Sequence, residues 1–400
     1  MRKVYLDHSA TTPVHPEVVK TINYYLTEAW GNPSSIHSVG REAKKGLEEA
    51  REKIAAVIGA KPEEITFTSG GTEADNMAII GGAYARQKKG NHLITTQIEH
   101  HAVLDAFKQL EKNGFEVTYL PVDEEGLISV DEFRKSIKDS TTLVSMMHVN
   151  NEIGTIQPIE EVGAITREKG ILFHVDAVQS YGKIPVDVNK LNVDMLTASS
   201  HKIYGPKGSG CLYIRKGVKI PSFTHGGAQE KKRRPGTENM PGIVGFGKAA
   251  EIVGQELESE MKRLSALRDK LTKGIEENIS DIRINGHRSK RLPGNVNISF
   301  RYIEGESLLL SLDMKGVAAS SGSACTSGSL DPSHVLLAIG LPHEIAHGSL
   351  RMTLGRDNTE EDIDYVLKVL PEIVTRLRSM SPLYQRKEAC QQKECYEHVQ

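Results

Sequence analysis

The sequence predicts an α/β protein with a large domain, built on a mostly parallel mixed sheet, and a smaller α+β domain. Strand-length apolar runs alternate with stretches of helical spacing through the first half of the chain, and from about Glu238 long helical stretches dominate. Such alternation is typical of a parallel sheet covered by helices, and 400 residues suit two packed domains. We expect the large domain at 15–255, the small domain at 1–14 and 256–382, and a loosely held tail at 383–400.

The strand candidates of the large domain are short runs of aliphatic and β-branched residues. They lie at 65–67, 92–96, 116–120, 143–149, 171–176, 195–199 and 210–215. Apolar residues at helical spacing mark helices between them, at 47–58, 103–110 and 159–169.

A long helical stretch from 238 to 279 leads from the large domain into the small one, and we expect it to be interrupted or bent near Pro241. Strands at 295–300 and 350–354 and helices at 307–313, 332–339 and 360–378 should follow.

Composition excludes several classes of protein. The chain has 50 Lys and Arg against 52 Asp and Glu, so no nucleic-acid or membrane-surface partner is implied. No apolar stretch approaches the length of a membrane span, and the N-terminus meets charges too soon for a signal peptide. Four scattered cysteines do not make a disulfide framework, which favours a reducing cytoplasm.

The first candidate binding element follows the strand at 65–67. Gly70 and Gly71 let backbone N–H groups point at an anion at the start of a helix, and Thr72 adds a hydroxyl, so a phosphate site is possible. The alternative is an ordinary capped turn with Thr72 as N-cap and Asp75 completing a capping box.

Two further candidates lie at strand ends. Asp176 ends a strand of buried type, with Gln179 three residues beyond; alternatively, Asp176 only caps the next helix. Lys202 lies between a polar turn and a Gly-Pro turn, where desolvation would make its amine a nucleophile, although most lone lysines are simply solvated. An anion cradle, a carboxylate and a lysine together match the needs of pyridoxal phosphate: a phosphate site, a partner for the ring nitrogen and a Schiff-base amine.

Cys325 lies in a run of small and polar residues with no aliphatic side chain larger than alanine. Such a run cannot bury much apolar surface, so we expect an exposed, mobile loop with an accessible thiol. Cys211 is expected to be a buried core cysteine, and Cys390 and Cys395 have no spacing typical of a zinc or redox site.

Together these motifs resemble the cysteine desulfurases of the class V aminotransferase family, in the group with housekeeping and nitrogen-fixation-type sulfur donors. The resemblance extends to about Tyr384 and is carried by YLDHSATT (5–12), GNPSS (31–35), TTQIEH (95–100), HVNNEIG (148–154), SHKIYGPKG (200–208), RPGTEN (234–239) and SGSACTSG (321–328). It implies the pyridoxal-phosphate transferase fold of type I and a homodimer.

The resemblance also implies roles for individual residues. The catalytic residues would be Lys202, which carries the cofactor and removes the α-proton, His100, which stacks on the cofactor ring, and Cys325, the sulfur acceptor. The cofactor-binding residues would be Gly71, Thr72, His100, Asn151, Asp176, Gln179, Ser199, His201, Lys202 and Thr237, the last from the neighbouring subunit. The substrate-binding residues would be Asn32, Asn151 and Arg351, with Arg351 clamping the α-carboxylate unless it only forms a surface salt bridge.

The implied reaction converts L-cysteine to L-alanine and leaves a persulfide on Cys325, which passes sulfur to an iron–sulfur scaffold or another acceptor such as a tRNA-thiolation relay. No metal site is expected, apart from transient ligation of a nascent iron–sulfur cluster by Cys325. Selenocysteine β-lyase activity would be a side reaction. Two alternatives are a class V transaminase, which has no use for Cys325, and a scaffold protein without catalysis, which should lack Lys202 or Arg351.

Overall fold

The computed structural model describes residues 2–222, 224–321 and 332–385. The large domain contains a seven-stranded sheet in the order β2-β8-β7-β6-β5-β3-β4. Its strands are β2 (Ile65–Thr68), β3 (His92–Thr96), β4 (Glu116–Leu120), β5 (Thr141–Met147), β6 (Leu172–Asp176), β7 (Met195–Ser199) and β8 (Gly210–Ile214). β8 runs antiparallel to both of its neighbours, and all other pairs are parallel, which confirms the mostly parallel mixed sheet.

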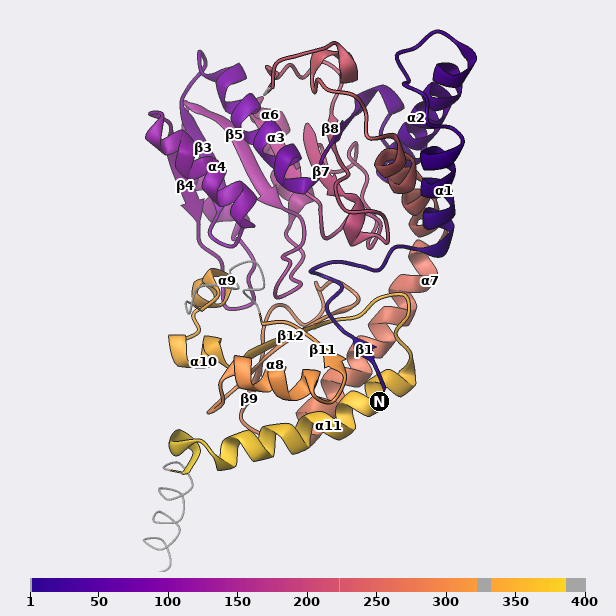
Figure 1. Cartoon of the computed structure of the whole chain (residues 1–400). Helices are drawn as coiled ribbons and strands as arrows, with labels where there is room; N and C mark the ends of the chain where they lie inside the picture. Colours follow the sequence, from indigo (N-terminus) through magenta and orange to yellow (C-terminus); the bar gives the residue numbers. More distant parts are fainter. Residues whose placement is uncertain (1, 223, 322–331, 386–400) are drawn as a thin grey trace, which may run out of the picture.

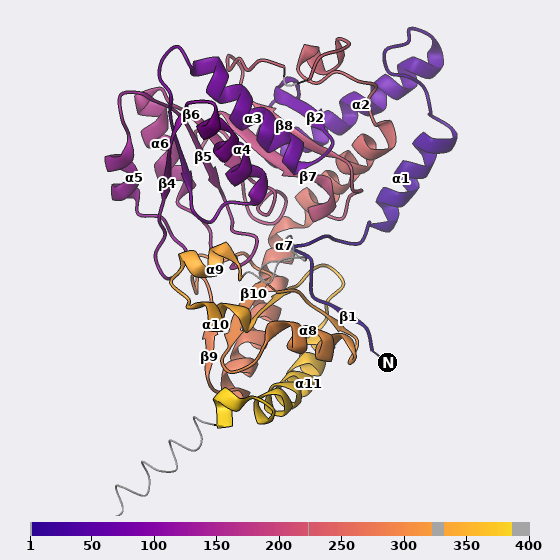
Figure 2. The same ribbon diagram turned by 60° about the vertical axis from the view of Figure 1, so that its left-hand side comes forward.

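The sheet is covered by helices on both faces, which explains why β5, β6 and β7 are buried along their whole length. On one face α3 (Gly71–Arg86) and α4 (His101–Lys112) pack against side chains such as Leu143. On the other face α2 (Ser38–Val57), α6 (Ile159–Lys169) and the start of α7 (Met240–Asn278) pack against side chains such as Val144. Figures 1 and 2 show this layering from two directions.

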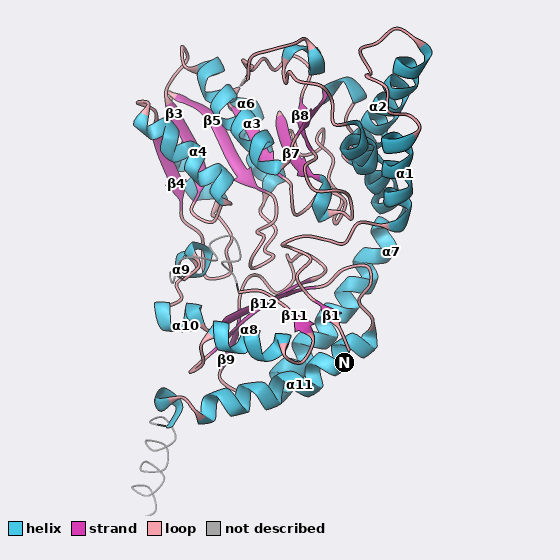
Figure 3. Cartoon of the chain, viewed as in Figure 1, coloured by secondary structure: helices cyan, strands magenta, loops and turns pink. Residues whose placement is uncertain are grey.

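The small domain is built on the three-stranded antiparallel sheet β12-β10-β9. Its strands are β9 (Ile282–Ile284), β10 (Asn295–Phe300) and β12 (Ser349–Thr353), and α8 (Gly305–Asp313), α11 (Glu360–Ser379) and the second half of α7 contribute to its core. The strand β1 (Val4–Tyr5) joins this domain by pairing with β11 (Val317–Ala318). Of two shorter helices, α9 (His334–Ala338) lies between the small sheet and the large domain, and α10 (His343–His347) lies beside the small sheet, in contact with β10 (Figure 3).

The predicted bend near Pro241 is wrong. Helix α7 is continuous over 39 residues, and Pro241 lies in its first turn, where a proline removes no helical hydrogen bond. The N-cap Asn239 accepts a hydrogen bond from the backbone N–H of Gly242 through its side chain, which fixes the start of the helix.

Several elements lie outside the predicted set: α1 (Pro16–Thr27), α5 (Val130–Ser136), α10, β1, β9 and β11. Cys211 is buried in β8 as expected, and burial raises the pKa of its thiol to about 12. Among the described residues, no helix combines the length and the apolar character that a membrane crossing requires.

Candidate active site

A cavity of about 380 Å³ lies at the carboxyl ends of the parallel strands, between the two domains. Its lining residues are Ser9, Ala10, Gly71, Thr72, Asp75, His100, Met147, Val149, Asn151, Asp176, Val178, Gln179, Ser199, His201, Lys202 and Arg351. Ten of the residues predicted from the sequence are therefore brought together in one place.

The topology explains why these residues meet. β5, β6 and β7 are parallel neighbours, so their last residues lie at one edge of the sheet. Asp176 is the last residue of β6, and Ser199 is the last of β7. The loop after β3 brings in His100, and β12 of the small domain brings in Arg351 from the opposite side.

Lys202 ends a single 3₁₀ turn that follows β7, Ser200–Lys202. Its Nζ donates hydrogen bonds to the backbone carbonyls of Ser9, at 2.5 Å, and Ala10, at 2.7 Å. The amine therefore lies inside the cavity wall, and the alternative of a solvated loop lysine is wrong.

Asp176 is buried, and desolvation raises the pKa of its carboxyl to about 6 despite a hydrogen bond from the N–H of Val178 and the nearby charge of Lys202. The bond from Val178, at 2.9 Å, means that Asp176 also caps the turn after its strand. Capping this turn does not remove Asp176 from the cavity, whose wall it lines, so its role in binding a ligand stays a prediction.

A second carboxyl, Asp75, lines the same cavity and was not predicted as a site residue. Burial, together with the charge of Asp176, raises the pKa of Asp75 well above its ordinary value. Two neighbouring buried carboxylates repel each other, so the pair favours a total charge of −1 over −2.

His100 is the N-cap of α4, where its Nδ1 accepts a hydrogen bond from the N–H of Ala102 at 3.1 Å. Burial and the nearby Lys202 lower the pKa of the imidazole to about 4, so the ring is neutral at physiological pH. Because Nδ1 accepts, the ring hydrogen must be on Nε2.

The start of α3 has no side-chain cap, since its N-cap is Gly70. The predicted capping box at Thr72 and Asp75 is wrong: Thr72 lies within the first turn, and Asp75 is buried below it. The first-turn N–H groups of a 16-residue helix thus begin at the cavity, where the helix dipole favours an anion. A Cβ at Gly71 would lie 2.9 Å from Cγ2 of Val178, so only glycine fits there without displacing Val178.

Arg351 is buried in β12, with 3% of its side chain exposed, so it does not form a surface salt bridge. Its Nη1 donates to the backbone carbonyl of Asn151, at 3.2 Å, and its Nη2 to Oδ1 of Asp7, at 3.0 Å. The pairing with Asp7 was not predicted.

Two predicted residues do not line the cavity of their own chain. Asn32 and Thr237 are both exposed. Their neighbours Ser34 and Glu238 line a separate hollow of about 480 Å³ on another part of the large domain.

Cys325, Cys390 and Cys395 lie outside the described residues, but both ends of the stretch that carries Cys325 are placed. Ser320 pairs with Arg351 through two backbone hydrogen bonds, of 3.1 and 2.6 Å. At the other end, Ser333 donates its hydroxyl hydrogen to Glu152 and His334 donates from Nε2 to the carbonyl of Glu99, at 2.9 Å.

The residues present fit pyridoxal phosphate. An amine, a buried carboxylate and an uncapped helix start lie around one cavity, which is the set of groups that this cofactor requires. The sequence missed Ser9 and Ala10, because their contribution is a backbone carbonyl, and the only signal for them was their place in the motif at 5–12.

A lysine, an acid at a strand end and an arginine from a second domain define an enzyme site of the aminotransferase type. The chain belongs to the class V aminotransferase family, whose sequence model matches residues 4–366.

Within that family, the similarity is to cysteine desulfurases. The chain is 59% identical over 382 residues to the cysteine desulfurase IscS of Methanosarcina thermophila, covering 96% of this chain and 94% of the relative. It is 56% identical to the protein of the same name from Dictyoglomus turgidum, covering 96% and 98%.

The chain is also similar to solved structures over most of its length. A NifS-like protein that is 42% identical superposes with a TM-score of 0.88, covering 94% of this chain and all of that one. SspA in complex with cysteine, 39% identical, superposes with a TM-score of 0.79 and covers 88% and 99%.

Proposed function

We propose that this cavity carries out the reaction of an L-cysteine desulfurase, with Cys325 as the sulfur acceptor. The Cβ–S bond of L-cysteine breaks and a bond forms between its sulfur and Sγ of Cys325. The substrate carbon is reduced to the methyl group of L-alanine while the two sulfurs are oxidised to a persulfide, so no external oxidant is needed. The observation that carries this proposal is the meeting of Lys202, Asp176 and Arg351 in one cavity of a chain that is 59% identical to a cysteine desulfurase.

The enzymes of this family depend on pyridoxal phosphate, and we propose that this cavity binds it. Lys202 would hold its aldehyde carbon and Asp176 its ring nitrogen, with Gly71, Thr72, Ser199 and His201 at the phosphate. Gln179 and Asn151 would contact the ring oxygen. When bound, the cofactor withdraws electrons from the substrate's α-carbon and so makes the α-hydrogen acidic.

Three residues of the chain have separate roles in the reaction: Arg351, Lys202 and His100. Arg351 binds the α-carboxylate of L-cysteine, which orients the α-hydrogen toward Lys202. The Lys202 amine removes that proton and can return one, because its Nζ is held by two carbonyls that accept but cannot donate. His100 is neutral and offers an Nε2–H donor rather than a positive charge.

We further propose a homodimer in which Asn32 and Thr237 complete the partner's cavity. In support, large apolar side chains beside Asn32 are exposed: Trp30 at 67% and Ile36 at 90%. Such exposure on a large domain is typical of a surface that another subunit covers. The pair W30S/I36S should be monomeric in light scattering and inactive, whereas M314S, which changes the exposed residue directly after α8, should stay dimeric. A fully active monomeric wild type would contradict the dimer.

We propose the cytoplasm as the compartment and an iron–sulfur scaffold, or another protein with a reactive thiol, as the acceptor of the sulfur. The cytoplasm is reducing, which keeps the Cys325 thiol free between turnovers.

The decisive test is C325S. The loaded wild type should release alanine and sulfide from L-cysteine in the presence of a thiol, and C325S should lose this activity while still changing its cofactor absorbance when L-cysteine is added. A transaminase would keep its full activity in C325S. K202A is the control, and it should lose both the desulfurase activity and the absorbance change.

A further inference from the structure

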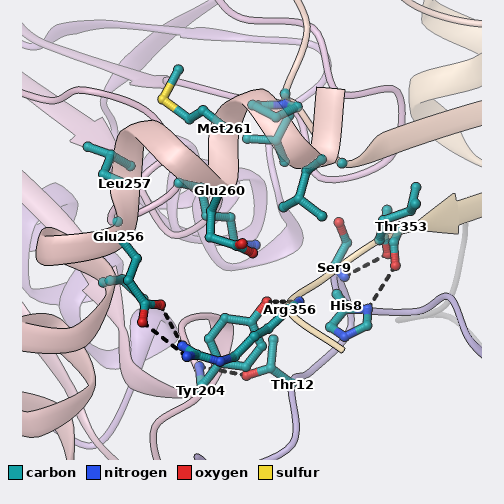
Figure 4. Close-up of a pocket in the computed structure, with 18 residues that line it drawn as sticks. His8, Ser9, Thr12, Tyr204, Glu256, Leu257, Glu260, Met261, Thr353 and Arg356 are labelled. Atoms are coloured by element: carbon teal, nitrogen blue, oxygen red, sulfur yellow. Dashed lines mark hydrogen bonds and ion pairs between the residues drawn. The ribbon is translucent and has the colours of Figure 1, made fainter. Parts of the chain in front are cut away.

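The segment of residues 7–12, the N-terminal strap, runs along the boundary between the two domains. On the small-domain side, His8 donates from Nδ1 to the carbonyl of Thr353, at 2.9 Å, and the N–H of Ser9 donates to Oγ1 of Thr353, at 2.8 Å. Figure 4 shows His8 and Ser9 held against Thr353 beside a second, smaller pocket. The strap is therefore fixed to the strand that carries Arg351.

On the large-domain side, the same strap contacts the cofactor-binding residues. The carbonyl of Ser9 accepts hydrogen bonds from Lys202 and from Nε2 of Gln179, the latter at 3.0 Å. Oγ1 of Thr11 bonds Nδ1 of His201 at 3.1 Å. A strap held on both sides is a rigid base for the acidic side chain that it directs at Arg351, Asp7.

Asp7 and Asn151 hold the Arg351 guanidinium from two different segments of the chain. Asp7 accepts from Nη2, and the Asn151 carbonyl accepts from Nη1. Nε of Arg351 is buried and has no hydrogen-bond partner among the described residues. This leaves an N–H donor for a ligand on a guanidinium whose orientation is already fixed.

We propose that Asp7 is a positioning residue that sets how tightly Arg351 binds the α-carboxylate of the amino-acid substrate; the inference rests on the proposed function of Arg351. Asp7 acts in two opposing ways. Its oxygen fixes the arginine side chain, so less conformational freedom is lost when the substrate binds. Its charge also partly neutralises the guanidinium, which weakens the attraction for a second carboxylate and lets product leave.

Two variants separate these effects. D7N keeps an acceptor oxygen for Nη2 but removes the charge, whereas D7A removes both. On the holoenzyme, the dissociation constants of L-alanine and of ethylamine, which lacks the carboxylate, are measured by calorimetry for each variant. D7N should bind L-alanine at least as tightly as the wild type, and D7A should bind it about tenfold more weakly than D7N.

Ethylamine should bind all three proteins alike, and the KM for L-cysteine should rise in D7A with little change in kcat. Equal L-alanine affinities of D7A and D7N, or an equal loss for ethylamine, would overturn the role of Asp7. E256Q is the matched control, since Glu256 lies near the same domain boundary and pairs with Arg356 (Figure 4), whereas Arg351 bonds Asp7 and Asn151. E256Q should bind both ligands as the wild type does, and a preference for L-alanine altered as in D7A would overturn the proposal.

R351A separates failure of this inference from failure of the proposed function. It should lose the preference for L-alanine over ethylamine. If R351A keeps that preference, the carboxylate site itself is elsewhere and the assignment of Arg351 fails; if R351A loses it while D7A and D7N behave alike, only the role of Asp7 fails.

Discussion

At the scale of single residues, the sequence could predict candidate site residues that lie at or just after the end of a strand. It could not predict contacts between residues far apart in the sequence. Asp176 ends β6 and Lys202 ends the short turn that follows β7, at the edge where a parallel sheet presents its ligands. Asp7 reaches Arg351 across 344 positions of sequence, and no local pattern marks that pairing. Asp75 was wrongly predicted to complete a capping box, because an aspartate near the start of a helix is typical of that role and the local sequence does not show that its side chain is buried.

Glu99 is a residue whose environment gives a pH-dependent prediction. It is fully buried, and desolvation raises the pKa of its carboxyl from 4.5 to about 8 although Thr96 and the N–H of Met147 donate to it. Between these values the folded chain keeps a proton that the unfolded chain releases, so stability falls as pH rises, by up to about 1.4 kcal/mol per unit.

The variant E99Q mimics the protonated form and removes this slope. Relative to the wild type it should gain roughly 2 kcal/mol between pH 5.5 and pH 7.5, seen as a growing gap between the thermal midpoints of the two proteins. E258Q, which changes an exposed acid of α7, should show no such trend. A gap that stays constant with pH would mean that Glu99 is ionised in the folded protein.

At the scale of elements, the longer segments with strong periodicity could be predicted and the short ones could not. The bounds of β3, β4, β7 and β10 agree with the prediction to the residue. β3, β7 and β10 are buried at every residue, and β4 lies between the turn residues Gly114 and Pro121. β1 and β11 have two residues each and exist only because they pair with one another. Such strands carry no pattern of their own.

The start of α3 allows a test of the phosphate site. G71A should weaken the binding of pyridoxal phosphate by about tenfold or more, because its Cβ would press on Val178 and push the turn into the cavity. The double variant G71A/V178A removes that contact and should recover most of the affinity. Titration of the apoprotein with the cofactor, followed by absorbance, measures both.

Gly70 provides the matched control for this element. A Cβ at Gly70 would meet no atom within 4 Å, so G70A should bind the cofactor nearly as the wild type does. Equal losses in G70A and G71A would point to the helix start itself rather than to the contact with Val178.

At the scale of the whole molecule, α7 joins the two hydrophobic cores. Its first half contributes Phe246 and Val253 to the core of the large domain, and its second half contributes Leu267 and Leu271 to that of the small domain. The predicted domain division at 255/256 falls between these halves and stays a prediction. A continuous helix shared by two cores favours unfolding of both in one transition.

L271A tests this coupling, since Leu271 is fully buried in the small-domain core. The cavity should cost about 2–5 kcal/mol, and the thermal transition seen by circular dichroism should move down together with that seen by the fluorescence of Trp30 in the large domain. L310A, at an exposed position of α8, should move neither. A shift in circular dichroism alone would show that the domains unfold independently.

The bonds of Ser320 to Arg351 and of Ser333 to Glu152 hold two points of the chain beside the cavity, whatever the number of residues between them. The closure entropy of a stretch between two fixed points grows only with the logarithm of its length, so each doubling costs about 0.6 kcal/mol. Residues could therefore be added or removed between Ser320 and Ser333 while the cavity, its arginine and its lysine keep their places.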